Sequence, residues 1–166
     1  MLFEEAWYWL QQGERRQRIL IQLNQPLTVK QLARRVELSL DSCGYVLWEL
    51  EVYSLVECLN PAARRSRVNW LTELGVVCQG ELVKSKGLTE VKHDFPRVDW
   101  EAYGWICFSH RSAVVKALTR PMQPATIKRV GRFRDPQIRM SANNVRDIIR
   151  LFLERGIVQK VSIRGK

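Results

Sequence analysis

Apolar residues recur at intervals of three and four in three segments of the first half of the chain, which is the spacing of one face of an α-helix. These stripes are formed by Ile19, Leu20 and Leu23, by Val29, Leu32, Ala33 and Val36, and by Cys43, Val46, Leu47 and Leu50. Pro26 ends the first helix, and Thr28 and Ser39 cap the next two, because their hydroxyl oxygens accept hydrogen bonds from the free N–H groups of a helix start. The pattern predicts helices over residues 14–23, 28–36 and 39–53.

A short hairpin is predicted after the third helix. Residues 56–59 and 68–71 are short runs rich in apolar residues, and a turn that starts at Asn60-Pro61 lies between them. The tip of this hairpin carries Arg64, Arg65 and Arg67. Thr72 then caps a closing helix that we expect to reach about Gly80.

The pattern of the first half returns in the second half. Residues 26–34 (PLTVKQLAR) and 124–132 (PATIKRVGR) are identical at four of nine positions, and the aromatic segments 5–9 and 101–105 also correspond. The offset drifts between 95 and 102 residues, as expected for two copies of one unit that differ by short insertions. The sequence predicts a first domain over residues 1–80, a linker over 81–98 and a second domain over 99–166.

Three helices are predicted in the second copy as well, over residues 105–119, 126–133 and 142–155. Ser141 caps the last of them, and Gly156 follows its end, where a left-handed residue commonly stops a helix. We expect residues 157–163 to form the first strand of a hairpin with its tip at 164–166. The sequence ends there, so the second hairpin is expected to be truncated or completed by another segment.

The order of three helices and a hairpin, with three local motifs, resembles a known class of proteins. The motifs are Val56-Glu57-Cys58-Leu59-Asn60-Pro61 before the arginine tip, Trp70-Leu71-Thr72-Glu73-Leu74-Gly75 after it, and Trp105 to Arg111 at the start of the second copy. They are similar to the MarR-like, ArsR-like and archaeal winged-helix transcriptional regulators. The resemblance implies a mainly α fold with small β-hairpin wings, two winged helix-turn-helix domains in tandem, and regulation of transcription by binding double-stranded DNA.

The net charge of +10 is confined to one half of the chain. Residues 1–80 contain 9 Lys and Arg against 9 Asp and Glu, whereas residues 81–166 contain 18 against 8. A basic half favours a polyanionic partner, most simply nucleic acid. The alternative is that the charge only keeps the surface soluble.

The third helix of the second copy presents the residue types that recognise bases. If Val145, Ile148, Ile149 and Phe152 face the core, the outward side chains are Asn143, Arg146, Asp147 and Arg150, with Asn144 at the edge. Asn and Arg form paired hydrogen bonds with adenine and guanine in the major groove. Basic residues suited to phosphate contacts surround this helix, namely Lys128, Arg129, Arg132, Arg134, Arg139, Lys160, Arg164 and Lys166. The alternative interpretation is an ordinary solvated helix face.

The corresponding face in the first copy is different. It presents Asp41, Tyr45 and Trp48, an acidic and aromatic set that suits a protein contact better than a phosphate backbone. We therefore expect Tyr45 and Trp48 to form a protein interface, in a homodimer or with another partner. The alternative is that Arg64, Arg65 and Arg67 hold the DNA backbone while this helix recognises little.

Other functions find little support in the sequence. The four cysteines are widely spaced and are expected to be reduced thiols, and His93 and His110 are isolated, so we expect no metal and no other cofactor. No nucleotide-binding loop or catalytic constellation is present, which argues against an enzyme. No apolar run has membrane-spanning length and no signal peptide is recognised, so a cytoplasmic, nucleoid-associated protein is expected. A winged-helix scaffold for protein partners and a plasmid or replication initiator remain as alternatives.

Overall fold

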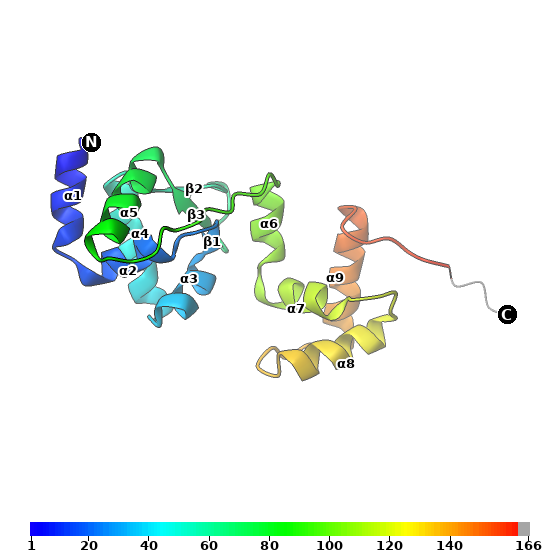
Figure 1. Cartoon of the computed structure of the whole chain (residues 1–166). Helices are drawn as coiled ribbons and strands as arrows, with labels where there is room; N and C mark the ends of the chain where they lie inside the picture. Colours follow the sequence, from blue (N-terminus) through cyan, green and yellow to red (C-terminus); the bar gives the residue numbers. More distant parts are fainter. Residues whose placement is uncertain (163–166) are drawn as a thin grey trace. The chain divides into compact units, whose positions relative to one another are not determined.

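The chain folds into two compact units with their boundary after Trp105 (Figure 1). The structure is a computed structural model, and it describes residues 1–162. Both units are mainly helical, and the first also contains a small antiparallel sheet, as the sequence predicts. The helices of the first unit are α1 (Phe3–Gln11), α2 (Glu14–Gln22), α3 (Val29–Val36), α4 (Leu40–Val52), α5 (Glu73–Ser85) and α6 (Trp100–Ile106), and its strands are β1 (Leu27–Thr28), β2 (Val56–Cys58) and β3 (Val68–Leu71).

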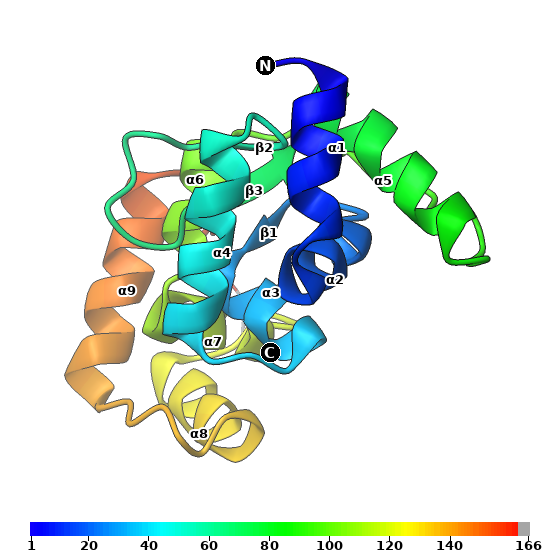
Figure 2. The ribbon, with the colours of Figure 1, turned by 90° about the vertical axis from the view of Figure 1, so that its left-hand side faces the viewer.

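The core of the first unit lies between α2, α3, α4 and α5, against one face of the sheet (Figure 2). The stripes predicted from the sequence are the buried ones: Ile19, Leu32 and Leu50 are completely buried. Full burial of one such side chain contributes about 1.5–3 kcal/mol, so these stripes dominate the stability of the unit. The helix starts are capped as predicted, with the hydroxyl oxygens of Thr28 and Ser39 accepting from backbone N–H groups three residues later.

The sheet has the strand order β1-β3-β2, so β3 is its central strand. Leu27 pairs with Asn69 on one side, and Glu57 pairs with Trp70 on the other. The loop between β2 and β3 is fixed by the buried side chain of Asn60, whose amide donates to Ser66 O at 3.1 Å and whose carbonyl accepts from Val68 N at 2.6 Å. The hairpin expected from the sequence is therefore present, and Asn60 joins the two ends of its loop.

The segment expected to be a linker is partly structured. Helix α5 continues to Ser85, beyond the expected end at Gly80, and residues 93–95 lie on the first unit. Asp94 N donates to Asn24 O at 2.8 Å, and the ring of Phe95 packs at 5.5 Å from that of Trp70. Helix α6 packs on the hairpin loop, where a side chain at Gly104 would collide with Asn60. The aromatic segment at residues 101–105 thus belongs to the first unit.

The second unit is built from α7 (Ser109–Ala117), α8 (Pro124–Arg134) and α9 (Ala142–Glu154), which pack on one another around a small core. Its buried side chains include Val114, Ile127, Met140, Val145 and Phe152. Gly131 of α8 allows the close approach of Met140, because a side chain there would collide with its Cε. Gly156 has φ +70° and ends α9 as the sequence predicts.

Three predictions for the second copy were wrong in detail. The helix expected over residues 105–119 is interrupted, since α6 ends at Ile106 and α7 begins at Ser109. The helix expected to begin at Thr126 begins at Pro124, because proline has no N–H to lose at the first helical position and its φ suits the helix. Residues 157–162 form no strand. Ile163 and the expected tip at 164–166 lie outside the described residues.

The two units nevertheless share the backbone geometry that surrounds their helices. Leu23 and Leu118, which follow α2 and α7, have φ/ψ of −81°/75° and −84°/74°. Ser54 and Gly156, which follow α4 and α9, have φ of 56° and 70°. The next residue then donates back to the helix in both units, Leu55 N to Leu50 O at 2.9 Å and Ile157 N to Phe152 O at 2.8 Å. The internal repeat is therefore structural as well as sequential.

Candidate nucleic-acid interface

Helix α9 has one buried face and one polar face, as its sequence pattern predicts. Val145, Ile148 and Phe152 are buried in the core of the second unit. Asn143 and Arg146 are exposed in the first half of the helix, where N–H groups and the positive end of the helix dipole favour an anion. This part of α9 offers side-chain donors and acceptors to a partner without further rearrangement.

Asn144 has a structural role that the sequence analysis did not assign to it. Its backbone N donates to Ser141 Oγ at 3.1 Å, and its side-chain Oδ1 accepts from Ser141 N at 3.2 Å and from Ser141 Oγ at 2.8 Å. This is a capping box in which Asn replaces the more common Glu or Gln. The motif Ser141-x-x-Asn144 was visible in the sequence as a helix-start signal.

Arg150 is held by a carboxylate on the same face of α9. Its Nη2 lies 3.3 Å from Asp147 Oδ1, one turn earlier, and both side chains are more than half exposed. Exposed pairs of this kind contribute only about 0.3–0.5 kcal/mol, so the pair orients Arg150 without fixing it. Among the residues expected to recognise bases, Arg150 is thus the one with a competing acidic partner beside it.

The basic residues of α8 and of the loop after it differ in their availability. Arg129, Arg132 and Arg139 are exposed, and Lys128 is half-buried. Arg134 donates through Nη1 to Lys116 O at 2.7 Å, which ties the end of α8 to the end of α7. Lys160 is exposed on the segment after α9. The remaining two basic residues expected to contact phosphates, Arg164 and Lys166, lie outside the described residues.

Phe133, which the sequence analysis did not single out, is the most exposed large apolar side chain of the described residues, at 88%. It lies in the last turn of α8 between Arg132 and Arg134. Ile127 and Gly131 mark the buried side of α8, and Phe133, two residues after Gly131, lies on the opposite side of the helix.

The boundary between the units separates the charge more completely than the two halves of the sequence do. Residues 106–166 contain 14 Lys and Arg against 3 Asp and Glu, a net charge of +11, whereas residues 1–105 contain 13 against 14, a net charge of −1. The net positive charge of this 61-residue unit attracts a polyanion over distances of about 8 Å at physiological salt.

The arginines of the hairpin tip lie in the loop between β2 and β3, and all three are exposed. Arg67 is tied to the hairpin, because its Nε donates to Cys58 Sγ at 3.2 Å and its Nη2 lies 3.6 Å from Glu51 Oε1. The hydrogen bond to the Cys58 sulfur raises the pKa of Arg67. Arg64 and Arg65 precede Arg67 in the same loop.

The outer face of α4 carries exposed aromatic side chains. Tyr45 and Trp48 are 59% and 57% exposed, and their ring centroids are 5.8 Å apart at an interplanar angle of 41°. Val52 continues the stripe one turn later and is also exposed. Glu49, on the same helix, is paired with Arg16 at 3.1 Å. This face is therefore mainly aromatic and apolar, and it keeps one exposed carboxylate, Asp41, one turn before Tyr45.

No group of three or more His, Cys, Asp and Glu side chains in the described part of the chain is arranged to hold a metal ion. Within residues 1–162, no helix combines the length and the apolar character that a membrane span needs. Comparison of the chain with protein-family models, with curated proteins and with solved structures finds no match.

Proposed function

We propose that the protein is a tandem winged helix-turn-helix protein that binds double-stranded DNA through its second unit and regulates transcription. The observation that carries this proposal is the concentration of charge, +11 on residues 106–166 against −1 on residues 1–105. Counterion release by lysine and arginine contacts supplies most of the affinity for a DNA backbone, and the excess of these residues over acidic ones is confined to the second unit.

In this proposal α9 enters the major groove. One face of α9 packs in the core of its own unit. The opposite face presents Asn143 and Arg146 in the first turns, and their side chains have the hydrogen-bonding groups that base edges require. Arg129 and Arg132 on α8 and Arg139 in the following loop are exposed and contact phosphates on either side. Asn144 contributes by fixing the start of α9, and only its Nδ2 group is left for a base.

The role of the first unit differs from that of the second. The face of α4 with Tyr45 and Trp48 lacks basic side chains, so it does not suit a phosphate backbone. The exposed Arg64 and Arg65 of the hairpin loop offer additional phosphate contacts. We propose that the first unit contributes mainly a protein contact through α4, and we retain a protein-binding scaffold as the second candidate function because of these two exposed rings.

The experiment that tests the proposal is a salt titration of binding to a fluorescent random duplex. The full chain should lose affinity steeply as the salt concentration rises. The double variant Arg129→Gln/Arg132→Gln should lower the slope of log K against log[salt] by about two, since each phosphate contact contributes about 0.9.

The matched control is Lys84→Gln/Lys86→Gln, which removes the same charge from exposed positions at the end of α5 in the first unit. It should leave the slope nearly unchanged. Equal effects of the two double variants would show that net charge alone is responsible. Salt-independent or absent binding of the unmodified chain would exclude the DNA proposal and favour the scaffold.

A further inference from the structure

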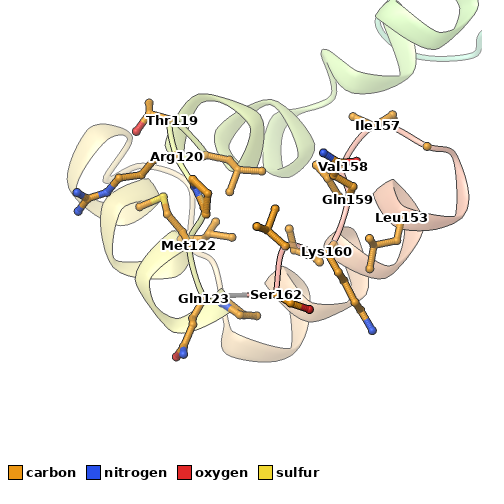
Figure 3. Close-up of a pocket in the computed structure, with 17 residues that line it drawn as sticks. Thr119, Arg120, Met122, Gln123, Leu153, Ile157, Val158, Gln159, Lys160 and Ser162 are labelled. Atoms are coloured by element: carbon orange, nitrogen blue, oxygen red, sulfur yellow. The ribbon is translucent and has the colours of Figure 1, made fainter. Parts of the chain in front are cut away.

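A pocket of about 1000 Å³ opens in the second unit between the loop after α7 and the segment after α9. Its floor includes Ile127 of α8 and Ile149 and Leu153 of α9. Figure 3 shows Met122 and Gln123 on one side of the hollow and the residues from Ile157 to Ser162 on the other. The proposed DNA-binding function makes no use of this pocket.

The internal repeat identifies what fills the same space in the first unit. There, β1 begins four residues after Leu23, as Met122 lies four residues after the equivalent Leu118, and Thr28 and Gln123 are the N-cap residues of α3 and α8. The sequence match of residues 26–34 with 124–132 has a register three residues later, so the three extra residues of the second copy, 124–126, form the start of α8. Strand β2 begins two residues after Ser54, as Val158 lies two residues after Gly156, and both follow the same turn. Because β3 lies between β1 and β2 in the first unit, the pocket corresponds to the position of the central strand.

We propose that this pocket is a docking slot for an extended segment of a partner protein, which inserts as a central β-strand between residues 122–123 and 158–162. The size of the pocket fits this occupant. A five-residue strand fills about 800 Å³, given a rise of about 3.4 Å per residue, a strand spacing of about 4.8 Å and a layer thickness of about 10 Å. One edge is available, because Gln159–Ser162 make no backbone hydrogen bond within the described residues. At the other edge Gln123 O accepts from Thr126 N and Ile127 N, so pairing there is left to Met122.

The side chains of the slot define the chemistry of the partner segment. The lining is mostly apolar, and Val158 and Val161 extend the apolar floor toward solvent. Among the described residues that line it, the charged ones are Arg120 and Lys160, both cationic. The complementary segment therefore has alternating apolar residues, like Val68 and Trp70 of β3, and acidic residues at its ends.

The repeat also shows which backbone groups face the slot. In the first unit Glu57 pairs with Trp70, and Leu59 N donates to Val68 O at 2.9 Å, so every second residue of that strand bonds to β3. The residue of the second unit equivalent to Glu57 is Gln159, three positions after Gly156 as Glu57 is three after Ser54. The N–H of Gln159 is therefore expected to bond to an inserted strand.

The test uses the full chain and a fluorescein-labelled peptide with the sequence of residues 68–73 (VNWLTE) preceded by an aspartate. Fluorescence anisotropy should show saturable binding, and a peptide of the same composition in scrambled order should bind at least tenfold more weakly. Gln159→Pro, which removes one N–H from a segment without backbone bonds, should lower the affinity at least tenfold. Gln159→Ala retains that N–H and should stay within about twofold of the unmodified chain.

Charge and hydrogen exchange provide two independent readouts. Lys160→Glu should weaken binding of the acidic peptide and strengthen binding of a version with lysines at both ends. Exchange of the Gln159 amide should slow on peptide binding, since it becomes bonded to the inserted strand. Absence of peptide binding would overturn the proposal. Equal affinity of Gln159→Pro and Gln159→Ala would also overturn it, because the pocket would then accept apolar ligands without strand pairing. The inference does not depend on DNA binding, and none of these readouts involves DNA.

Discussion

Asp147 and Arg150 lie one turn apart on the exposed face of α9, with Oδ1 and Nη2 separated by 3.3 Å. The pair places a carboxylate within the surface that we propose to meet DNA. A carboxylate there repels phosphates, and it also competes with the base for the guanidinium of Arg150. Asp147 is therefore expected to lower the affinity for DNA of any sequence. It also restricts the orientations of the Arg150 side chain.

We predict that Asp147→Asn increases affinity for random duplex DNA by about threefold to tenfold at low salt. The substitution removes one negative charge and frees Arg150, while the exposed position limits any loss of stability. Filter binding or anisotropy on a random duplex measures the change. Asp135→Asn, in the loop after α8, is the control that removes the same charge away from α9, and a gain of equal size there would show that only net charge matters.

A second prediction separates base recognition from phosphate contact. Arg146→Ala should cost about 1–3 kcal/mol on a preferred site and reduce discrimination among sequences, because Arg146 is exposed on the first turns of α9. Lys128→Ala should weaken all sequences alike and lower the salt slope by about one. The comparison needs a preferred site selected from random duplexes. If both variants lower affinity uniformly, α9 is a charged surface without sequence recognition.

The third prediction concerns the aromatic face of α4. Trp48→Ala should shift the chain from a dimer or other assembly toward the monomer, because Trp48 is 57% exposed beside Tyr45 and offers a large apolar contact. Sedimentation at several protein concentrations measures the mass. Val77→Ala, exposed on α5, provides a matched control for loss of an exposed apolar side chain. An unmodified chain that is monomeric at all concentrations would contradict a self-association role for this face.

Much of the helical fold follows from the sequence, because the buried stripes and the caps are local signals. Thr28, Ser39, Thr72 and Ser141 all accept the hydrogen bonds expected of helix caps. The hairpin was also predictable, since β3 begins and ends at the expected residues. The extra strand β1 has only two residues and depends on pairing with β3, so no local pattern identified it.

Features that depend on tertiary contacts escaped the sequence analysis. The segment around His93 and Asp94 is polar and aperiodic, and its attachment depends on Gln79 and Asn24, which are distant in sequence. Arg134 was expected to contact phosphate, but its partner Lys116 O is set by the packing of α7 on α8. For the candidate site, the sequence predicted which side chains of α9 are exposed and could not indicate that Asp147 pairs with Arg150 rather than Arg146.

The fourth prediction concerns the buried thiols. Burial raises the pKa of Cys43 and of Cys78 to about 11 from an ordinary value of 9.0. The unfolded chain therefore ionises these thiols first, so their contribution to stability is complete below pH 9.0 and is lost as the pH rises to about 11. Unfolding by urea should show a decrease on the order of 2 kcal/mol per thiol across this range.

The matching variant is Cys43→Ala/Cys78→Ala, in which the alkaline decrease should be smaller than in the unmodified chain. Thiol titration at pH 8 gives a second measurement. The half-buried Cys58 and Cys107 should react with a disulfide reagent before unfolding, whereas Cys43 and Cys78 should react only in denaturant. Rapid reaction of all four thiols in the native protein would contradict the burial on which the argument depends.

The last prediction concerns Gln79, which joins three parts of the first unit. Its Nε2 donates to Leu20 O at 2.7 Å and to Leu23 O at 3.1 Å, so its Oε1 is left as an acceptor, 2.6 Å from His93 Nε2. His93 must therefore donate from Nε2. Gln79 is 1% exposed. Gln79→Leu would leave Leu23 O without its donor, leave Leu20 O with the longer bond from Leu23 N at 3.3 Å, and leave His93 without its acceptor. We expect a loss of about 2–4 kcal/mol in the free energy of unfolding, since each unsatisfied buried group costs about 1–3 kcal/mol.

His93→Ala is the comparison that separates the two halves of this network. It removes the bond from the segment after α5 and its edge contact with Trp70, and it leaves Gln79 Oε1 without its donor. It should therefore cost about 1–2 kcal/mol and increase hydrogen exchange at Asp94 N, which donates to Asn24 O. Gln79→Leu should have the larger effect on global unfolding by urea, because it also releases the end of α2. If His93→Ala destabilises the chain as much as Gln79→Leu, then attachment of the segment, rather than satisfaction of the α2 carbonyls, is the main contribution of Gln79 to stability.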